Sequence, residues 1–322
     1  MAVKNNAAAV KFKKLLSGNG AFIALIALLI AASFMYEEFF TLNNMSNVLR
    51  QMSMVGLMSV GMTLVILTAG IDLSVGATVA ISAIIAARLS NHGILPAIAV
   101  PLVIGAVIGG VNGFIVNNLR IVPFIATLAV QMALRGAAYL MTDMKSIAVN
   151  RSEKTFIALG RGYFLGVPVP VIIFLAVSLI MIFICKKTGF GRSVYAIGGN
   201  EDAAGMMGLR VKRDKMLCYV ITGFLSSLAG VILCARLGAG QPVSGEGWEM
   251  DSIASVAIGG TLLTGGVGGV EKTICGVLII GFIKNIINLQ GDVNSYWQKI
   301  IMGLILLLVV MIQNKTFRKG AV

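Results

Sequence analysis

Residues Lys186–Lys215 read KKTGFGRSVYAIGGNEDAAGMMGLRVKRDK, the longest polar and basic interruption in an otherwise apolar sequence. Apolar runs precede and follow it, and a run of about 20 residues is long enough to cross a bilayer as a helix. The basic residues of the interruption are Lys186, Lys187, Arg192, Arg210, Lys212, Arg213 and Lys215. Because Lys and Arg concentrate in cytoplasmic loops, the stretch predicts a membrane bundle that carries this loop on its cytoplasmic side.

A short helix is predicted inside this loop. Asn200 suits its N-cap, because the side chain accepts hydrogen bonds from the free N–H groups of a first turn. The acidic residues 201 and 202 complement the helix dipole, and Gly208 suits a left-handed cap at the other end. The apolar face of the helix would consist of Ala203, Met206 and Met207. Such a helix presses either on a partner protein or on lipid headgroups, and the local chemistry leaves both open.

Composition places the chain among membrane proteins. Of its 322 residues, 57% are hydrophobic and 12% are charged, whereas soluble domains are about 25% charged. The net charge of +13 is spread over short segments between apolar runs, which argues against nucleic-acid binding and for orientation of membrane spans. His92 is the single histidine, so a catalytic pair of histidines is excluded. The cysteines, expected to be small buried hydrophobes, are Cys185, Cys218, Cys234 and Cys275.

The order of the apolar runs predicts an all-α polytopic bundle of about ten transmembrane helices with both termini cytoplasmic. The first run, Ala21–Tyr36, is expected to be an uncleaved span. The predicted segments are a basic arm (1–20), a transmembrane domain (21–314), a basic tail (315–322), the cytoplasmic loop (186–215) and two extracytoplasmic loops (142–166 and 237–252).

The run Val48–Ala87 is too long for one span, so a break is expected at Ala69–Gly76. Asp72 and Ser74 lie inside that break. A carboxylate that faces lipid costs roughly 2.5–3.5 kcal/mol or more, so such residues face a cavity or have a function. Asp72 therefore either caps the next helix or lines a transport path, and the two roles are compatible.

Two asparagines near a membrane exit, Asn285 and Asn288, share one helix face at i and i+3. Hydrogen bonds between helices and the lining of a path fit them equally well. Short segments with Gly-rich turns recur in the two halves of the chain, at Val60–Gly76 and Val256–Gly269. Paired, interrupted spans of this kind indicate a transporter built from repeats.

Two apparent motifs are rejected. The stretch TGGVGGVEKT (Thr264–Thr273) suggests a phosphate loop, but Val and Glu separate the last glycine from Lys272. Its glycines are expected to form a tight re-entry turn instead. The acidic residues Glu246, Glu249 and Asp251 suggest an acid/base pair, but they are expected to be solvated or helix-capping carboxylates on an outer loop.

Four stretches, in order, resemble a single family: Gly61–Ser82 (GMTLVILTAGIDLSVGATVAIS), Phe124–Gly136 (FIATLAVQMALRG), Gly191–Leu209 (GRSVYAIGGNEDAAGMMGL) and Gln241–Gly269 (QPVSGEGWEMDSIASVAIGGTLLTGGVGG). They are similar to the permease subunit of ribose-type ABC sugar importers, a family that also includes xylose, galactose and autoinducer-2 permeases. The resemblance covers nearly the whole chain after the N-terminal arm.

The resemblance implies a homodimeric permease in the cytoplasmic (inner) membrane of a bacterium. It would form the translocation path for a monosaccharide, ribose or a related pentose or hexose. The implied partners are a cytoplasmic ABC ATPase subunit, an extracytoplasmic sugar-binding protein, a second permease copy and membrane lipid, with no nucleic acid. ATP and Mg would bind to the ATPase, so this chain is expected to hold no cofactor or metal and to catalyse no reaction.

The coupling helix of the family corresponds to Gly199, Asn200, Glu201, Ala203, Ala204 and Gly208, which favours the partner reading of the short helix. Candidate residues for docking the binding protein are Lys145, Arg151, Lys154, Trp248 and Glu249. Lys284 departs from the family, in which relatives tend to have Asn, and it is expected to alter the path or to pair with the binding protein. The alternative function is a self-sufficient, ion-coupled secondary sugar transporter, for which Asp72 is the one candidate carboxylate within the spans.

Overall fold

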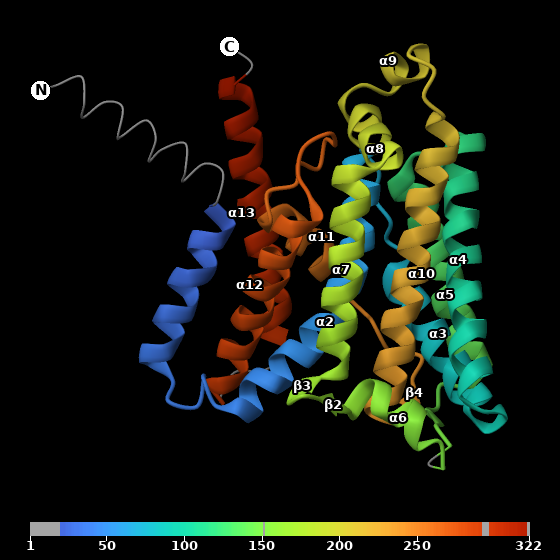
Figure 1. The fold of residues 1–322 in the computed structure, drawn as a ribbon, viewed down its shortest axis with the longest axis vertical. Helices are drawn as coiled ribbons and strands as arrows, with labels where there is room; N and C mark the ends of the chain where they lie inside the picture. Colours follow the sequence, from blue (N-terminus) through green and yellow to red (C-terminus); the bar gives the residue numbers. More distant parts are fainter. Residues whose placement is uncertain (1–19, 151, 292–295, 321–322) are drawn as a thin grey trace, which may run out of the picture.

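A computed structural model describes residues 20–150, 152–291 and 296–320, with side chains to residue 311. These residues form an elongated bundle of helices (Figure 1), so an all-α membrane protein is confirmed. Five helices of the described part are long and apolar enough to cross a bilayer: α2 (Leu42–Leu67), α4 (Ile94–Asn118), α5 (Pro123–Thr142), α7 (Val169–Lys187) and α10 (Val211–Leu237). The count of about ten spans and the cytoplasmic termini stay predictions, and residues 1–19 and the side chains of 315–322 lie outside the described part.

The remaining helices are shorter, less apolar or incompletely covered. Two shorter apolar helical stretches are Gly20–Met35 and Tyr296–Met311, the second within α13 (Tyr296–Gly320). The other helices are α3 (Val75–Leu89), η1 (Ser90–His92), α6 (Lys154–Arg161), α8 (Gly189–Gly199), α9 (Glu201–Met206), α11 (Trp248–Ile258) and α12 (Val270–Leu289).

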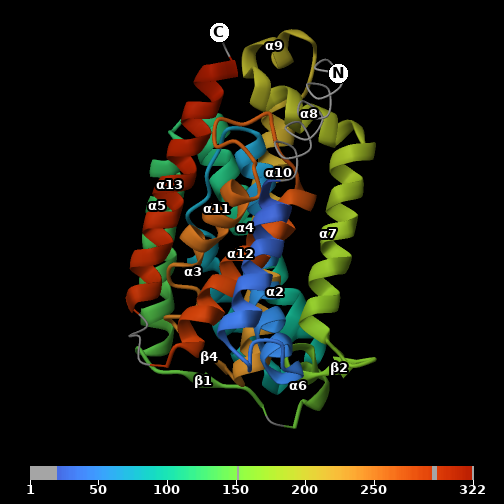
Figure 2. The same ribbon diagram turned by 90° about the vertical axis from the view of Figure 1, so that its left-hand side faces the viewer.

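Two short antiparallel ribbons lie at the end of the bundle opposite α9 (Figures 1 and 2). β1 (Ile147–Ala148) pairs with β4 (Ala239–Gly240), and β2 (Tyr163–Phe164) pairs with β3 (Val167–Pro168). The predicted loop 142–166 therefore contains β1, α6 and β2, and the pairing of β1 with β4 joins it to the second predicted outer loop.

The core is built around α2, whose middle and second half are buried among α7, α10, α11 and α12. Beside it, α4 and α10 pack with their backbones nearly touching. A Cβ added at Gly109 would lie 2.1 Å from the Tyr219 carbonyl oxygen, and one at Gly223 would lie 2.1 Å from the Gly105 carbonyl oxygen. The glycines of both helices therefore let the two backbones approach closely, as small residues do between membrane helices.

The predicted break in the run Val48–Ala87 is confirmed, because α2 ends at Leu67 and α3 begins at Val75. At 1.5 Å per residue, α3 is about 22 Å long and α11 about 16 Å, so neither crosses the hydrocarbon of about 30 Å alone. The starts of these two half-helices meet inside the bundle. A Cβ added at Gly76 of α3 would lie 2.4 Å from the carbonyl oxygen of Gly245, which precedes α11.

The Gly-rich segment between α11 and α12 is a tight turn, as predicted. Its positive φ angles of 91°, 88°, 73° and 136° fall at Gly260, Gly265, Gly266 and Gly268, which is the region that favours glycine. The prediction that 237–252 is one outer loop is wrong at its end. The helix α11 already begins at Trp248, and the side chains of Glu249 and Asp251 are buried.

Candidate coupling site and transport path

The short helix predicted in the basic loop is α9, and its caps are the predicted ones. The Asn200 side chain accepts a hydrogen bond of 2.9 Å from the Ala203 N–H. Gly208 follows the helix with a φ of 81°, and the next N–H, of Leu209, donates to the Ala204 carbonyl at 3.1 Å. Gly199 is the last residue of α8, directly before the cap. Local hydrogen bonds thus fix both ends of a helix of less than two turns.

The apolar residues of α9 divide into an anchor and an exposed tip. Ala204 is fully buried, whereas Met206 is 84% exposed and Met207 is 70% exposed. Figure 1 shows α9 at the far end of the molecule, beyond α8. Methionine is flexible and polarisable, which suits contact with a second protein surface. The predicted face of Ala203, Met206 and Met207 is therefore replaced by two outward methionines held by an inward alanine.

The helix α8 connects α9 to the end of α2 and to the Gly-rich turn. A Cβ added at Gly198 would lie 1.8 Å from the Leu67 carbonyl oxygen and 2.4 Å from the Gly266 nitrogen. The Gly266 N–H itself donates to that Leu67 oxygen at 3.0 Å. Burial raises the pKa of Tyr195 to about 12, so its hydroxyl stays protonated and donates to the Gly268 carbonyl at 2.9 Å. Sequence reasoning missed Gly198 and Tyr195, because their partners are distant in sequence.

Ion pairs join the basic loop to the neighbouring helices. Lys215 at the start of α10 contacts Glu201 of α9 at 2.8 Å, and Lys186 at the end of α7 contacts Glu271 of α12 at 2.8 Å. Both pairs are partly exposed, so each contributes little to stability, about 0–1 kcal/mol. Their main effect is to hold α9 and α7 in place, since they join these two helices to helices that reach into the bundle.

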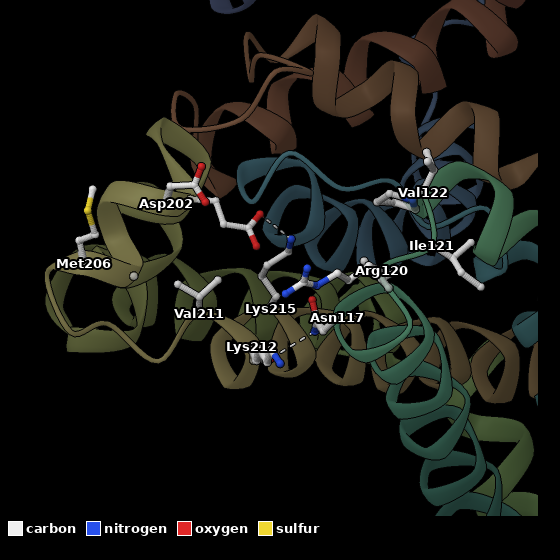
Figure 3. Close-up of a pocket in the computed structure, with 13 residues that line it drawn as sticks. Asn117, Arg120, Ile121, Val122, Asp202, Met206, Val211, Lys212 and Lys215 are labelled. Carbon is white, nitrogen blue, oxygen red and sulfur yellow. Dashed lines mark hydrogen bonds and ion pairs between the residues drawn. The ribbon is translucent and has the colours of Figure 1, made fainter.

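A cavity of about 650 Å³ lies between α9 and the turn that joins α4 to α5 (Figure 3). One wall carries Glu201, Asp202 and Met206 of α9, and the opposite wall carries residues 116–117 and 120–123. Lys215 and Lys212 lie between the walls, where Lys215 meets Glu201 and the Asn117 side chain donates to the Lys212 carbonyl at 3.2 Å. The start of α5 thus faces α9 across an open space.

Asp72 and Ser74 form a buried polar group at the start of α3. Asp72 Oδ1 accepts from the Ser74 N–H at 2.9 Å and from the Ser74 hydroxyl at 2.7 Å. Asn112 of α4 donates to that same oxygen at 3.2 Å and to the Ser74 hydroxyl at 2.7 Å. Asp72 therefore caps the turn into α3 and fastens it to α4. Asp72 Oδ2 is buried without a hydrogen-bond partner among the described residues.

The predicted path residues of α12 make contacts between helices. Asn285 and Asn44 of α2 exchange hydrogen bonds of 2.7 and 3.0 Å. Asn288 accepts from Gln298 of α13 at 2.6 Å. Lys284 forms a mostly buried ion pair with Asp251 of α11. The structure thus gives Lys284 a partner inside its own chain in place of the binding protein, whereas an effect of Lys284 on the path stays a prediction. Asp251, expected to be solvated or helix-capping, is a buried and paired carboxylate.

The candidate docking residues differ in exposure. Lys145 is exposed beside Asp143, at 3.0 Å, and Lys154 is exposed at the start of α6. Trp248 is half-buried, and Glu249 is buried and accepts from Gln131 of α5 at 3.1 Å. Arg151 lies outside the described residues. Of the two alternatives expected for Glu249, the solvated one is wrong, because α11 carries it into the bundle, whereas its place in the first turn of α11 fits the helix-capping one.

Sequence comparison assigns the family. A family model described as branched-chain amino acid transport system / permease component matches residues 44–310. The chain belongs to this permease family. The permease is 41% identical to the ribose import permease protein RbsC of Haemophilus influenzae over 316 residues, which cover 97% of this chain and 98% of that protein.

Other relatives are also sugar permeases by name. The ribose import permease protein RbsC of Bacillus subtilis is 43% identical over 95% of each chain. The D-allose transport system permease protein AlsC of Escherichia coli is 37% identical over 91% of this chain and 90% of its own length. No solved structure matches the permease. Matches over nearly the full length make this chain the permease subunit of a ribose-type ABC sugar importer, and such permeases are transport subunits without a catalytic role of their own.

Proposed function

We propose that two copies of this chain form the path by which ribose or a related aldose crosses the inner membrane of a bacterium. A cytoplasmic ATPase binds ATP and Mg and drives the cycle, and an extracytoplasmic binding protein delivers the sugar. The similarity to ribose import permeases over 95% or more of the chain supports this substrate class. The branched-chain amino acid label of the family model is broader, and the sugar-named relatives decide between the two.

The coupling role of α9 rests on its shape. Its two methionines face outward and Ala204 anchors it, while Gly198 of α8, the helix that leads into α9, lies directly against Leu67 and the Gly-rich turn. A push on α9 would therefore reach the end of α2 and the turn before α12 through backbone contacts. Packed interfaces of this kind switch between discrete arrangements, so they can pass a conformational change from one helix to the next. The coupling set is Gly199, Asn200, Glu201, Ala203, Ala204 and Gly208.

The path and docking assignments follow from position. The break that holds Asp72 and Ser74 lies inside the bundle, next to the meeting point of α3 and α11. Asn285 and Asn288 set the spacing of α12 from α2 and α13. For the binding protein, the exposed Lys145 and Lys154 are the docking residues that we retain, since long-range charge speeds encounter. No finding favours the self-sufficient ion-coupled carrier.

The test is Ala204→Trp in cells that also produce the ATPase and the binding protein. The indole does not fit at the fully buried position of Ala204, so α9 would be displaced from the residues on which it packs. We expect the chain to remain in the membrane while the co-purified ATPase and the uptake of labelled ribose both fall at least about tenfold, which corresponds to 1.4 kcal/mol of lost coupling.

The matched control is Ala99→Trp, at an exposed position of α4, and it should behave as the native chain. Ribose uptake that survives Ala204→Trp without ATPase bound would disprove coupling through α9. If the native complex takes up another aldose and not ribose, that aldose is the substrate, and the proposed substrate class still holds.

A further inference from the structure

Three polar residues spaced by four lie along one face of α5: Thr127, Gln131 and Arg135. Residues at i, i+4 and i+8 point to the same side of a helix. The face belongs to the stretch Phe124–Gly136, one of the four that carry the family resemblance, yet neither the coupling site nor the path described above includes it. All three side chains bind segments that interrupt a membrane helix.

Thr127 binds the interruption between α2 and α3. Its hydroxyl oxygen accepts from the Leu73 N–H at 3.0 Å, and it lies 3.3 Å from the Ile71 carbonyl. The hydroxyl donates back to the Pro123 carbonyl of its own helix at 2.9 Å. Thr127 is fully buried. A buried backbone N–H without a partner costs about 1–3 kcal/mol, so this contact fixes where the first interruption lies against α5.

Gln131 and Arg135 bind the second interruption, the segment that leads into α11. Gln131 Nε2 donates to Glu249 Oε1 at 3.1 Å. Arg135 Nη1 donates to the carbonyls of Pro242 and Ser244, at 2.6 and 3.0 Å. The same helix face therefore holds both interrupted segments, at the place where their backbones touch.

Few other residues of α5 are buried within this chain. In its most apolar window only 17% of the residues are buried, compared with 89% for α2 and 72% for α10. Its first turn, at Val122 and Pro123, lines the cavity beside α9 (Figure 3). Within this chain α5 is thus fastened to both interrupted segments along one face, and its first turn borders the cavity beside α9, so a displacement of that turn would be passed on to what α5 binds.

We propose that Thr127, Gln131 and Arg135 form a clamp through which α5 holds both interrupted helices in register and moves them together when the cytoplasmic end is displaced. Thr127 fixes the position of the α2–α3 segment, and Gln131 and Arg135 fix the position of the start of α11. The residues act by position and need not touch the sugar. The clamp as a structural device stands on the contacts alone, whereas its role in transmission rests on the proposed function.

The first experiment tests the contacts on the purified chain in detergent. Gln131→Glu places two carboxylates together, and Glu249→Gln places two amides together. The double variant Gln131→Glu/Glu249→Gln restores a donor and an acceptor with their sides exchanged. We expect Gln131→Glu to lower the melting temperature and the double variant to recover most of the loss, as contacting pairs do in a double-mutant cycle. A double variant that melts no higher than Gln131→Glu overturns the clamp.

The second experiment tests transmission in the complete importer, as sugar taken up per ATP hydrolysed. Thr127→Val keeps the shape of the side chain and removes the hydroxyl, and Thr127→Ser keeps the hydroxyl. We expect Thr127→Val to lower uptake per ATP about tenfold and Thr127→Ser to restore it, since 1.4 kcal/mol corresponds to a factor of ten. The control is Met132→Leu, at a position of α5 that is 69% exposed, which should leave the ratio unchanged.

The outcomes separate the clamp from the proposed function. If Thr127→Val lowers uptake only in proportion to the amount of importer in the membrane, its ratio stays native and transmission through α5 is overturned. If the native chain forms no complex with an ATPase, the proposed function fails, while the melting cycle still decides whether the clamp exists.

Discussion

The helix α9 and the junction of α3 with α11 are both short helical elements in polar sequence, yet they are held in opposite ways. The caps of α9 come from residues within a few positions of it, and Met206 and Met207 stay exposed. At the junction, the local bonds between Asp72 and Ser74 are joined by hydrogen bonds between residues far apart in the chain, such as Gln131 and Glu249. The exposed tip of α9 fits its proposed contact with a partner, whereas an interrupted helix inside a bilayer needs neighbouring segments to satisfy its backbone.

The largest effect should come from filling the contact between the two half-helices. In Gly76→Ala, the new Cβ would lie 2.3 Å from Glu249 Oε2 and 2.4 Å from the Gly245 oxygen. Overpacking against a backbone atom costs about 3 kcal/mol, so we expect little folded chain in the membrane. Gly110→Ala of α4 is the matched control, because its nearest neighbour would be 3.8 Å away. Equal yields and melting temperatures for the two variants would show that the half-helices do not meet at Gly76.

An intermediate effect is expected at Asp72. Asp72→Ala leaves the Ser74 N–H and the Asn112 amide without their shared acceptor, at a cost of about 1–3 kcal/mol. Asp72→Asn keeps an acceptor and should retain most of the stability and transport. Thermal melting and ribose uptake measure the two variants side by side. A loss in Asp72→Asn as deep as in Asp72→Ala would mean that the negative charge, and not the hydrogen bond, is what the break requires.

The smallest effect should come from the cap of α9. Asn200→Ala removes the acceptor for the Ala203 N–H and should weaken the helix by about 1 kcal/mol. The melting temperature of the bundle should not change, because α9 lies outside it, but uptake should fall severalfold. Asn200→Ser keeps a capping oxygen and serves as the control. If Asn200→Ala lowers the melting temperature but leaves uptake unchanged, α9 stabilises the bundle and does not couple it to a partner, which contradicts the distinction between α9 and the junction.

The sequence was sufficient wherever a structure depends on neighbours in the chain. The break at Ala69–Gly76, the cap at Asn200 and the turn that contains Gly265 and Gly266 follow from residue types and spacing alone, and all are confirmed. The ordering of apolar runs predicted the helical bundle, since each run must satisfy its own backbone in lipid.

What the sequence did not reveal depends on distant pairing. The segment before α11 contains Gly245 and Gly247 and looks like an exposed loop, so Glu249 was expected to be solvated or helix-capping on an outer loop. Its burial follows from the meeting of α11 with α3, and no local pattern encodes that meeting. Likewise, Lys284 and Asp251 lie 33 positions apart and pair because α11 packs on α12. The face of Thr127, Gln131 and Arg135 was not singled out from the sequence, because the segments that it binds are distant in the chain.

The ribbon of β1 and β4 imposes a rule on the construction of chimaeras between relatives. Ile147 faces Gly240 across this ribbon, and a Cβ at Gly240 would lie 2.5 Å from the Ala83 oxygen. A grafted outer segment 142–166 must therefore bring a compatible partner strand with it and leave glycine at position 240. Epitope tags and sequence insertions intended to spare assembly belong outside both strands.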